Sequence, residues 1–152
     1  MVISSDEERY TFSSLMTLLI ECERKLQQYY QKASITTDDS EVASILTDYA
    51  KKTLQSIDLM QRARVETVVE MALEPITNLK LAELIKCVDS GIEVGKAGYV
   101  QGLVTIEVAV SQLYSQVSPK IANMSAETSE LLMRLSRESV ERVHELEQSL
   151  TH

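Results

Sequence analysis

The chain is poor in the residues that interrupt helices and form turns. Its 152 residues include four glycines, two prolines, one phenylalanine and no tryptophan. A β-sandwich or barrel needs many tight turns, so these fold classes are disfavoured, and no strand is predicted. No apolar run approaches the roughly 18 residues that a membrane-spanning helix needs. We therefore expect a soluble all-helical protein in which residues 1–152 form a single domain.

Cysteine and histidine are also scarce. Cys22 and Cys87 are the only cysteines, and both have apolar neighbours and lie outside any CxxC motif. This pattern is typical of core cysteines in a reducing compartment. The only histidines are His144 and His152, so a nucleophile paired with a base has no local signature. An enzyme is less expected than a non-catalytic protein.

Positive charge is in deficit, because 15 lysines and arginines face 23 acidic residues and give a net charge of −8. Phosphate backbones are bound by clustered basic residues, and membrane surfaces by basic amphipathic helices. Neither a nucleic acid nor a membrane is therefore expected as a partner. The opening MVISSDEERY is acidic, where a secretion signal would be basic and then apolar, which favours a cytoplasmic location.

Apolar residues recur at alternating spacings of three and four, which indicates amphipathic helices. The stripes fall within residues 12–30, 42–60, 100–117 and 132–150, and the second points on toward Val68 and Ala72. Four long helices predict an antiparallel four-helix bundle: two helix hairpins joined by a crossover that contains a short extra helix. Capping residues and prolines place helix starts at Ser5 (a capping box with Glu8), Asp39 or Ser40, Pro75 and Ser125, and helix ends near Ser34, Gly91 and Pro119.

All four glycines lie at positions 91, 95, 98 and 102, so they would share one side of a helix. The segment is either a flexible joint or a helix whose bare side lets another helix approach closely. The apolar residues between the glycines favour the helix. Its bare side is then the candidate surface for self-association, most simply as a symmetric dimer.

A repeated pair links the first helix to the one over residues 100–117. Glu23 precedes Tyr30 by seven residues, and Glu107 precedes Tyr114 by the same step. Both glutamates lie on an apolar stripe, where a carboxylate is costly unless it is paired or bound to a cation. One interpretation is a pair of metal ligands. The alternative is that each carboxylate pairs with a lysine or arginine of a neighbouring helix or reaches water, and that the tyrosines are core residues.

The last helix adds Glu141-x-x-His144, a carboxylate and an imidazole on adjacent turns. With the Glu–Tyr repeat, this pattern resembles the ferritin-like superfamily, which includes rubrerythrins and bacterioferritins. The resemblance implies two helix hairpins around a dinuclear metal site. It implies that Glu23 and Glu107 are the single carboxylates and that Glu141 and His144 form one of two Glu-x-x-His motifs.

The second Glu-x-x-His motif is missing. Glu141 follows Glu107 by 34 residues, and the same step from Glu23 reaches Ile57, with Met60 at the position of the histidine. Moreover, Glu141 and His144 lie beside Arg137 and Gln148 rather than on the apolar stripe, so a solvated face is the alternative for them.

Three functional hypotheses remain. The first is a ferritin-like bundle without a complete di-iron site, acting as a binding or scaffold protein through self-association or a protein partner. The second is a metalloprotein that holds iron, manganese or zinc at a reduced site of Glu23, Glu107, Glu141 and His144. The third is a subunit whose apolar face is completed by another chain.

Overall fold

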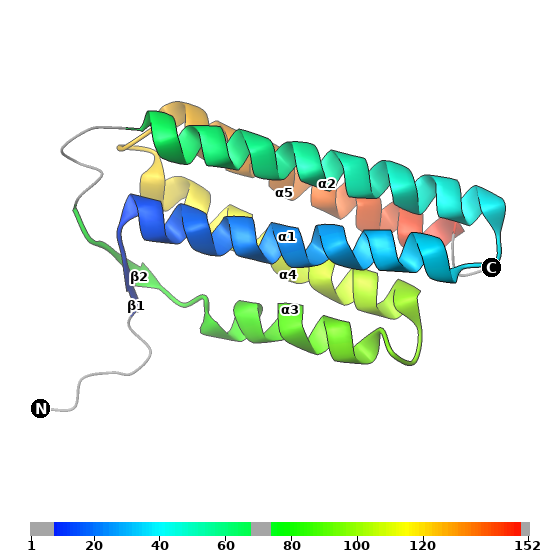
Figure 1. Cartoon of the computed structure of the whole chain (residues 1–152). Coiled ribbons are helices and arrows are strands. Elements are labelled where there is room, and N and C mark those ends of the chain that lie inside the picture. Colours follow the sequence, from blue (N-terminus) through cyan, green and yellow to red (C-terminus); the bar gives the residue numbers. More distant parts are fainter. Residues whose placement is uncertain (1–7, 68–73, 150–152) are drawn as a thin grey trace, which may run out of the picture.

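The computed structural model describes residues 8–67 and 74–149. This part of the chain is almost entirely helical, which confirms the all-helical prediction (Figure 1). One small antiparallel sheet departs from it. The elements in chain order are β1 (Glu8–Tyr10), α1 (Phe12–Thr36), α2 (Ser40–Glu66), β2 (Ile76–Leu79), α3 (Ala82–Val94), α4 (Tyr99–Ile121) and α5 (Ala126–Ser149).

The helices pack as two hairpins with one additional helix. Successive helices run in opposite directions, so α1 pairs with α2 and α4 pairs with α5 (Figure 1). The shorter α3 packs against α4. The two hairpins contact each other mainly through α1 and α4, which run antiparallel. Contacts between α2 and α5 are far sparser than those within each hairpin. The seam between α2 and α5 is therefore the loosest part of this packing.

The first helix begins later than the sequence predicts. Thr11 caps α1, because its side chain accepts from the backbone N–H of Ser14 at 3.1 Å and the Ser14 hydroxyl accepts from the Thr11 N–H in return. Ser5 lies outside the described residues. Glu8 instead belongs to β1, and its carboxylate accepts from the backbone N–H groups of Leu81 and Ala82 at 3.0 and 2.8 Å. It thus caps the start of α3.

The short third helix also begins later than predicted. Pro75 does not start it, because residues 76–79 form β2, which pairs with β1 through Glu8 opposite Leu79 and Tyr10 opposite Ile76. The φ of Asn78 is 63°, a left-handed conformation that a right-handed helix does not tolerate. Because α2 ends at Glu66, the expected run through Val68 and Ala72 falls on residues outside the described part.

Two predicted caps are confirmed, and two predicted helix ends are not. Asp39 caps α2 by accepting from Glu41 and Val42, and the Ser125 hydroxyl accepts from the Thr128 N–H at 3.1 Å at the start of α5. Helix α3 continues past Gly91 to Val94, because a glycine is tolerated inside a helix. Helix α4 continues past Pro119 to Ile121. In the last turn a proline removes only one helical hydrogen bond, so the helix is able to end two residues later.

The glycines neither form one helix nor leave a face free for another chain. Gly95 ends α3 and Gly98 precedes α4, so a tight turn joins the two helices. A Cβ at Gly102 would lie 2.7 Å from the Gly91 carbonyl oxygen and 2.7 Å from the Gly95 Cα. The bare side therefore serves the close approach of α3 to α4 within the chain, which corrects the expectation that it is a dimer surface.

Gly102→Ala is expected to lower the free energy of unfolding by about 1–3 kcal/mol, because the added methyl overlaps backbone atoms that cannot rotate away. Urea denaturation followed by circular dichroism measures the loss. Gly98→Ser is the matched control, since a Cβ there meets no atom within 4 Å. Equal stability of the two variants would contradict the close approach.

The helices of the second hairpin are joined by serine pairs. The Ser111 and Ser136 hydroxyls lie 3.1 Å apart, and those of Ser118 and Ser129 lie 2.9 Å apart. Each pair also donates to the opposite backbone, as the Ser129 hydroxyl does to the Ser118 carbonyl at 2.8 Å. Because serine is small and its hydroxyls are satisfied here, α4 and α5 pack closely without leaving buried polar groups unpaired.

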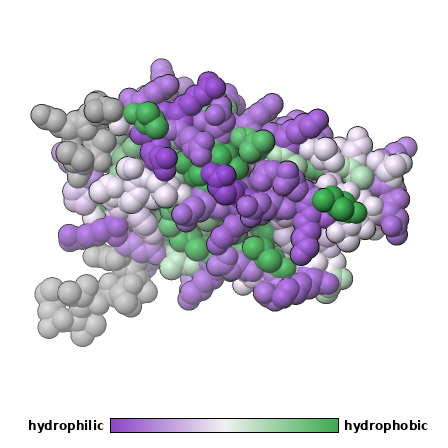
Figure 2. Space-filling model, in the orientation of Figure 1, coloured by the Kyte–Doolittle hydropathy of each residue, from purple (hydrophilic) through white to green (hydrophobic). Residues whose placement is uncertain are grey.

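The two cysteines differ in solvent exposure. Cys22 is buried as predicted, but Cys87 is exposed, because α3 turns Val88 and Gly91 inward instead. The face shown in Figure 2 is mostly hydrophilic, with apolar side chains in small separate patches. Within the described ranges, no helix combines the length and the apolar character needed to cross a membrane.

Candidate functional site

The four predicted ligands fall into two groups. Glu23 on α1 and Glu107 on α4 are buried, with exposed fractions of 1% and 0%. Glu141 and His144 are exposed on α5. The structure therefore brings the two single carboxylates into the interior and leaves the Glu-x-x-His pair on the outer face. Helical phase is the reason, because the buried side of α5 includes Ser139 and Leu146 and excludes positions 141 and 144.

The two Glu–Tyr repeats interlock across the α1–α4 contact. The Tyr30 hydroxyl donates to Glu107 Oε2 at 2.5 Å, and the Tyr114 hydroxyl donates to Glu23 Oε2. Since α1 and α4 are antiparallel and the step is seven residues in both, each tyrosine lies opposite the glutamate of the other helix. Each buried carboxylate thus receives a hydrogen bond from a buried phenol.

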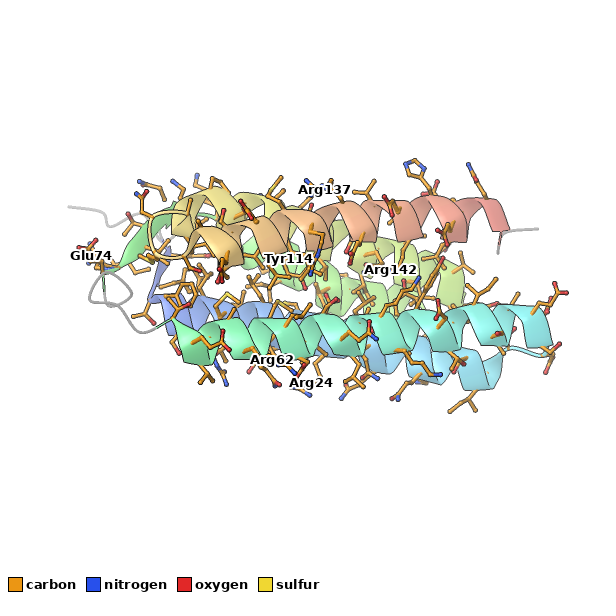
Figure 3. The ribbon with its side chains drawn as sticks, turned by 90° about the horizontal axis from the view of Figure 1, so that it is seen from above. Arg24, Arg62, Glu74, Tyr114, Arg137 and Arg142 are labelled. Carbon is orange, nitrogen blue, oxygen red and sulfur yellow. The ribbon has the colours of Figure 1, made fainter. Side chains whose placement is uncertain are left out.

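Arg142 on α5 completes the cluster. Its guanidinium Nε donates to Glu107 Oε2, and its Nη2 donates to Glu107 Oε1 at 3.2 Å. The Nη2 also lies 3.3 Å from the Ser139 hydroxyl, and the residue is only 6% exposed. In Figure 3, Tyr114 and Arg142 lie between the two hairpins, whereas Arg24 and Arg137 lie at the outer edges. Arg142 therefore supplies a buried positive charge that binds Glu107 through both carboxylate oxygens.

The cluster holds two carboxyl groups but one guanidinium. Burial raises the pKa of Glu23 to about 7; the Arg142 charge and the Tyr114 hydrogen bond oppose this rise, and the Glu107 charge adds to it. Burial would lower the pKa of Arg142, but the charge and hydrogen bonds of Glu107 raise it overall. Arg142 and Glu107 thus form the ion pair, while the raised pKa of Glu23 lets it gain or lose its proton near neutral pH.

The tyrosines of the cluster remain protonated. Burial, together with the neighbouring carboxylates, raises the pKa of Tyr30 and Tyr114 well above the ordinary value. Nearer the surface, the Tyr49 hydroxyl donates to the Glu145 carboxylate, and the Tyr49 ring meets the Tyr30 ring edge to face with centroids 5.5 Å apart. These phenols act as hydrogen-bond donors to carboxylates.

The loose seam between α2 and α5 leads toward this cluster. It contains a cleft of about 350 Å³ whose lining includes Tyr49, Ser56, Arg142 and Glu145. A neighbouring cleft along the same seam shares Leu59 and Arg134 with it. The Arg142 end of the cluster therefore borders a surface cleft on the α2–α5 side.

The donor set does not match a dinuclear centre. Within residues 8–67 and 74–149, no three His, Cys, Asp or Glu side chains are grouped so as to hold a metal ion. Only Glu23 and Glu107 of the four predicted ligands face the interior, and a cation between them would have to displace the Arg142 guanidinium. What the arrangement provides is a fixed positive charge held by carboxylate and phenol groups.

Sequence reasoning missed Arg142, although a signal was present. Position 142 is three residues after Ser139 and four before Leu146, so it belongs to the buried stripe of α5. The expected alternative of a glutamate paired with a basic residue of a neighbouring helix describes Glu107 correctly.

Comparisons with known proteins add no identity. No model of a protein family matches the chain, and no significant match is found among curated proteins or solved structures. Geometry alone therefore carries the functional conclusion.

Proposed function

We propose that the chain is a four-helix bundle of the ferritin-like kind in which an arginine takes the place of the metal centre, and that it acts as a non-catalytic binding or scaffold protein in the cytoplasm. The carrying observation is the Arg142 guanidinium, which binds both oxygens of the buried Glu107. A metal cation and a guanidinium can each neutralise carboxylates inside an apolar core.

The helix arrangement supports this kinship. Helices α1 and α4 are antiparallel neighbours, and each forms a hairpin with the helix that follows it, α2 or α5. Helix α3 lies in the long connection between the two hairpins. The interior carboxylates come from the first helix of each hairpin, as the ferritin-like resemblance implies for Glu23 and Glu107. Arg142 stands on the second helix of the second hairpin, next to the position proposed for a metal-binding glutamate.

A binding role suits the chemistry of the interior. Arginine stays charged at any physiological pH and does not transfer protons, so it stabilises charge without reacting. Burial raises the pKa of the Cys22 thiol to about 11, which keeps it protonated and weakly nucleophilic. The partner is a protein, a second copy of the chain or a small ligand that docks on a helix surface.

Metal analysis tests the proposal against its main competitor, a reduced site that holds iron, manganese or zinc. Protein purified without a tag is expected to contain no stoichiometric metal, and Glu107→Ala, Glu141→Ala and the exposed control Glu41→Ala are expected to leave this unchanged. About one metal ion per chain that is lost in Glu107→Ala but kept in Glu41→Ala would overturn the proposal that Arg142 takes the place of a metal.

A further inference from the structure

Another cavity, away from the buried cluster, is lined by residues of α1, the end of α3 and the start of α4. Figure 1 shows the end of the molecule where α1 ends and α3 turns into α4. It measures about 450 Å³, which is within the usual range for small-molecule sites. Its α1 side follows one helical face, and its other side is the end of α3, the turn and the start of α4. The charged, aromatic and large apolar side chains of its lining are Lys25, Tyr29, Lys32, Ile92, Lys96 and Tyr99.

The glycine turn shapes this cavity. A Cβ at Gly95 would overlap the Tyr29 hydroxyl, so the missing side chain lets the tyrosine ring lean against the turn and form a wall. Burial raises the pKa of Tyr29, which keeps its hydroxyl protonated. Within the described part of the chain this hydroxyl has no hydrogen-bond partner, so it remains able to bind a ligand. Ile92 and Tyr99 supply apolar and aromatic surface beside it.

The lining of the cavity includes three lysines and no carboxylate, although the chain as a whole is acidic. Lys25 pairs with Asp89 at 2.8 Å, and Lys96 pairs with Glu93 at 3.0 Å. Lys32 lines the same cavity and has no ion pair among the described residues. Of the three lysines that line this mainly apolar hollow, Lys32 is therefore the one left to pair with an anion.

We propose that this cavity binds a small organic monoanion, a carboxylate attached to a flat apolar body. The carboxylate pairs with Lys32, and the apolar body lies against Ile92 and the two tyrosine rings. An anion is favoured over a neutral ligand because it pairs with the Lys32 ammonium group. This inference rests on the proposed binding role and gives it a ligand class.

The probe is 2-naphthoate, titrated into the full-length protein and followed by heteronuclear NMR shifts and calorimetry; 2-naphthol is the neutral comparison. We expect 2-naphthoate to shift the signals of residues 25–36 and 92–99 and to bind at least about fivefold more tightly than 2-naphthol. Lys32→Glu reverses the charge of an exposed side chain and is expected to lower the affinity for 2-naphthoate roughly tenfold. Lys120→Glu makes the same charge change on α4, away from the cavity, and should retain the affinity.

Equal binding of the acid and the alcohol, with no effect of Lys32→Glu, would overturn the charge preference. Equal losses in Lys32→Glu and Lys120→Glu would mean that only net charge matters, and would overturn the site. If neither compound shifts the signals of the cavity, the ligand site is wrong. The proposal that Arg142 takes the place of a metal would stand in each case, because metal analysis tests it separately.

Discussion

Glu107→Gln is expected to lower the free energy of unfolding by about 3–5 kcal/mol, the largest effect of any conservative substitution considered. The glutamine oxygen still accepts a hydrogen bond from Tyr30, but an NH2 group replaces one of the two oxygens that accept from Arg142, so the charge and one acceptor are lost together. Arg142 would then be a guanidinium that is 6% exposed and has no adjacent carboxylate bound to it. Such a change is a large fraction of the stability of an ordinary domain, and urea denaturation at pH 7 measures it.

Two companion variants show that the loss comes from the unpaired buried charge. Lys52→Gln breaks the exposed pair between Lys52 and Asp48 on α2 and is expected to cost less than about 1 kcal/mol. Combining Glu107→Gln with Arg142→Met removes both charges and is expected to recover most of the stability. A loss under about 1 kcal/mol in Glu107→Gln alone would mean that the pair is solvated and does not organise the interior.

Stability is expected to fall as the pH rises from about 4.5 to about 7, by about 3 kcal/mol, because of Glu23. Burial raises the pKa of this carboxyl from 4.5 to about 7 in the folded chain. Between these values the folded state keeps a proton that the unfolded state has lost, so each step up in pH favours unfolding. Below pH 4.5 both states are protonated, and above about pH 7 both are ionised, so the contribution is level in both regions.

Glu23→Gln is expected to remove this pH dependence, since the amide does not ionise and still accepts from Tyr114. The decisive quantity is the difference in unfolding free energy between pH 5 and pH 8, measured in urea for the wild type and the variant. Glu21→Gln, an exposed position on the same helix, should keep the wild-type difference. Parallel pH profiles for Glu23→Gln and wild type would show that Glu23 is not buried with a raised pKa.

The sequence predicted the parts of the site that depend on local spacing. The step from Glu23 to Tyr30 is repeated from Glu107 to Tyr114, and burial of all four side chains follows from the apolar stripes. The sequence could not tell which tyrosine meets which glutamate, because that depends on α1 and α4 running antiparallel at one register. It also left open whether a metal or a basic residue faces the carboxylates.

Other outcomes required information from distant parts of the chain. Glu8 looks like half of a local capping box, yet it caps α3 because β1 pairs with β2 and carries the carboxylate to Leu81 and Ala82. The glycine spacing fits one helix as well as it fits two. The turn at Gly95 forms because Gly91 and Gly102 allow α3 and α4 to cross closely.

By itself, the sequence determined that the chain is helical, where most helices lie and that Glu23 and Glu107 fall on apolar stripes, because helical periodicity links residues only three or four positions apart. Tertiary structure alone decided that Arg142 neutralises Glu107 and that the glycines allow α3 to pack closely against α4. Those results depend on the rotation of α5 and on the register between helices, which are set by packing of all the stripes together rather than by any one of them.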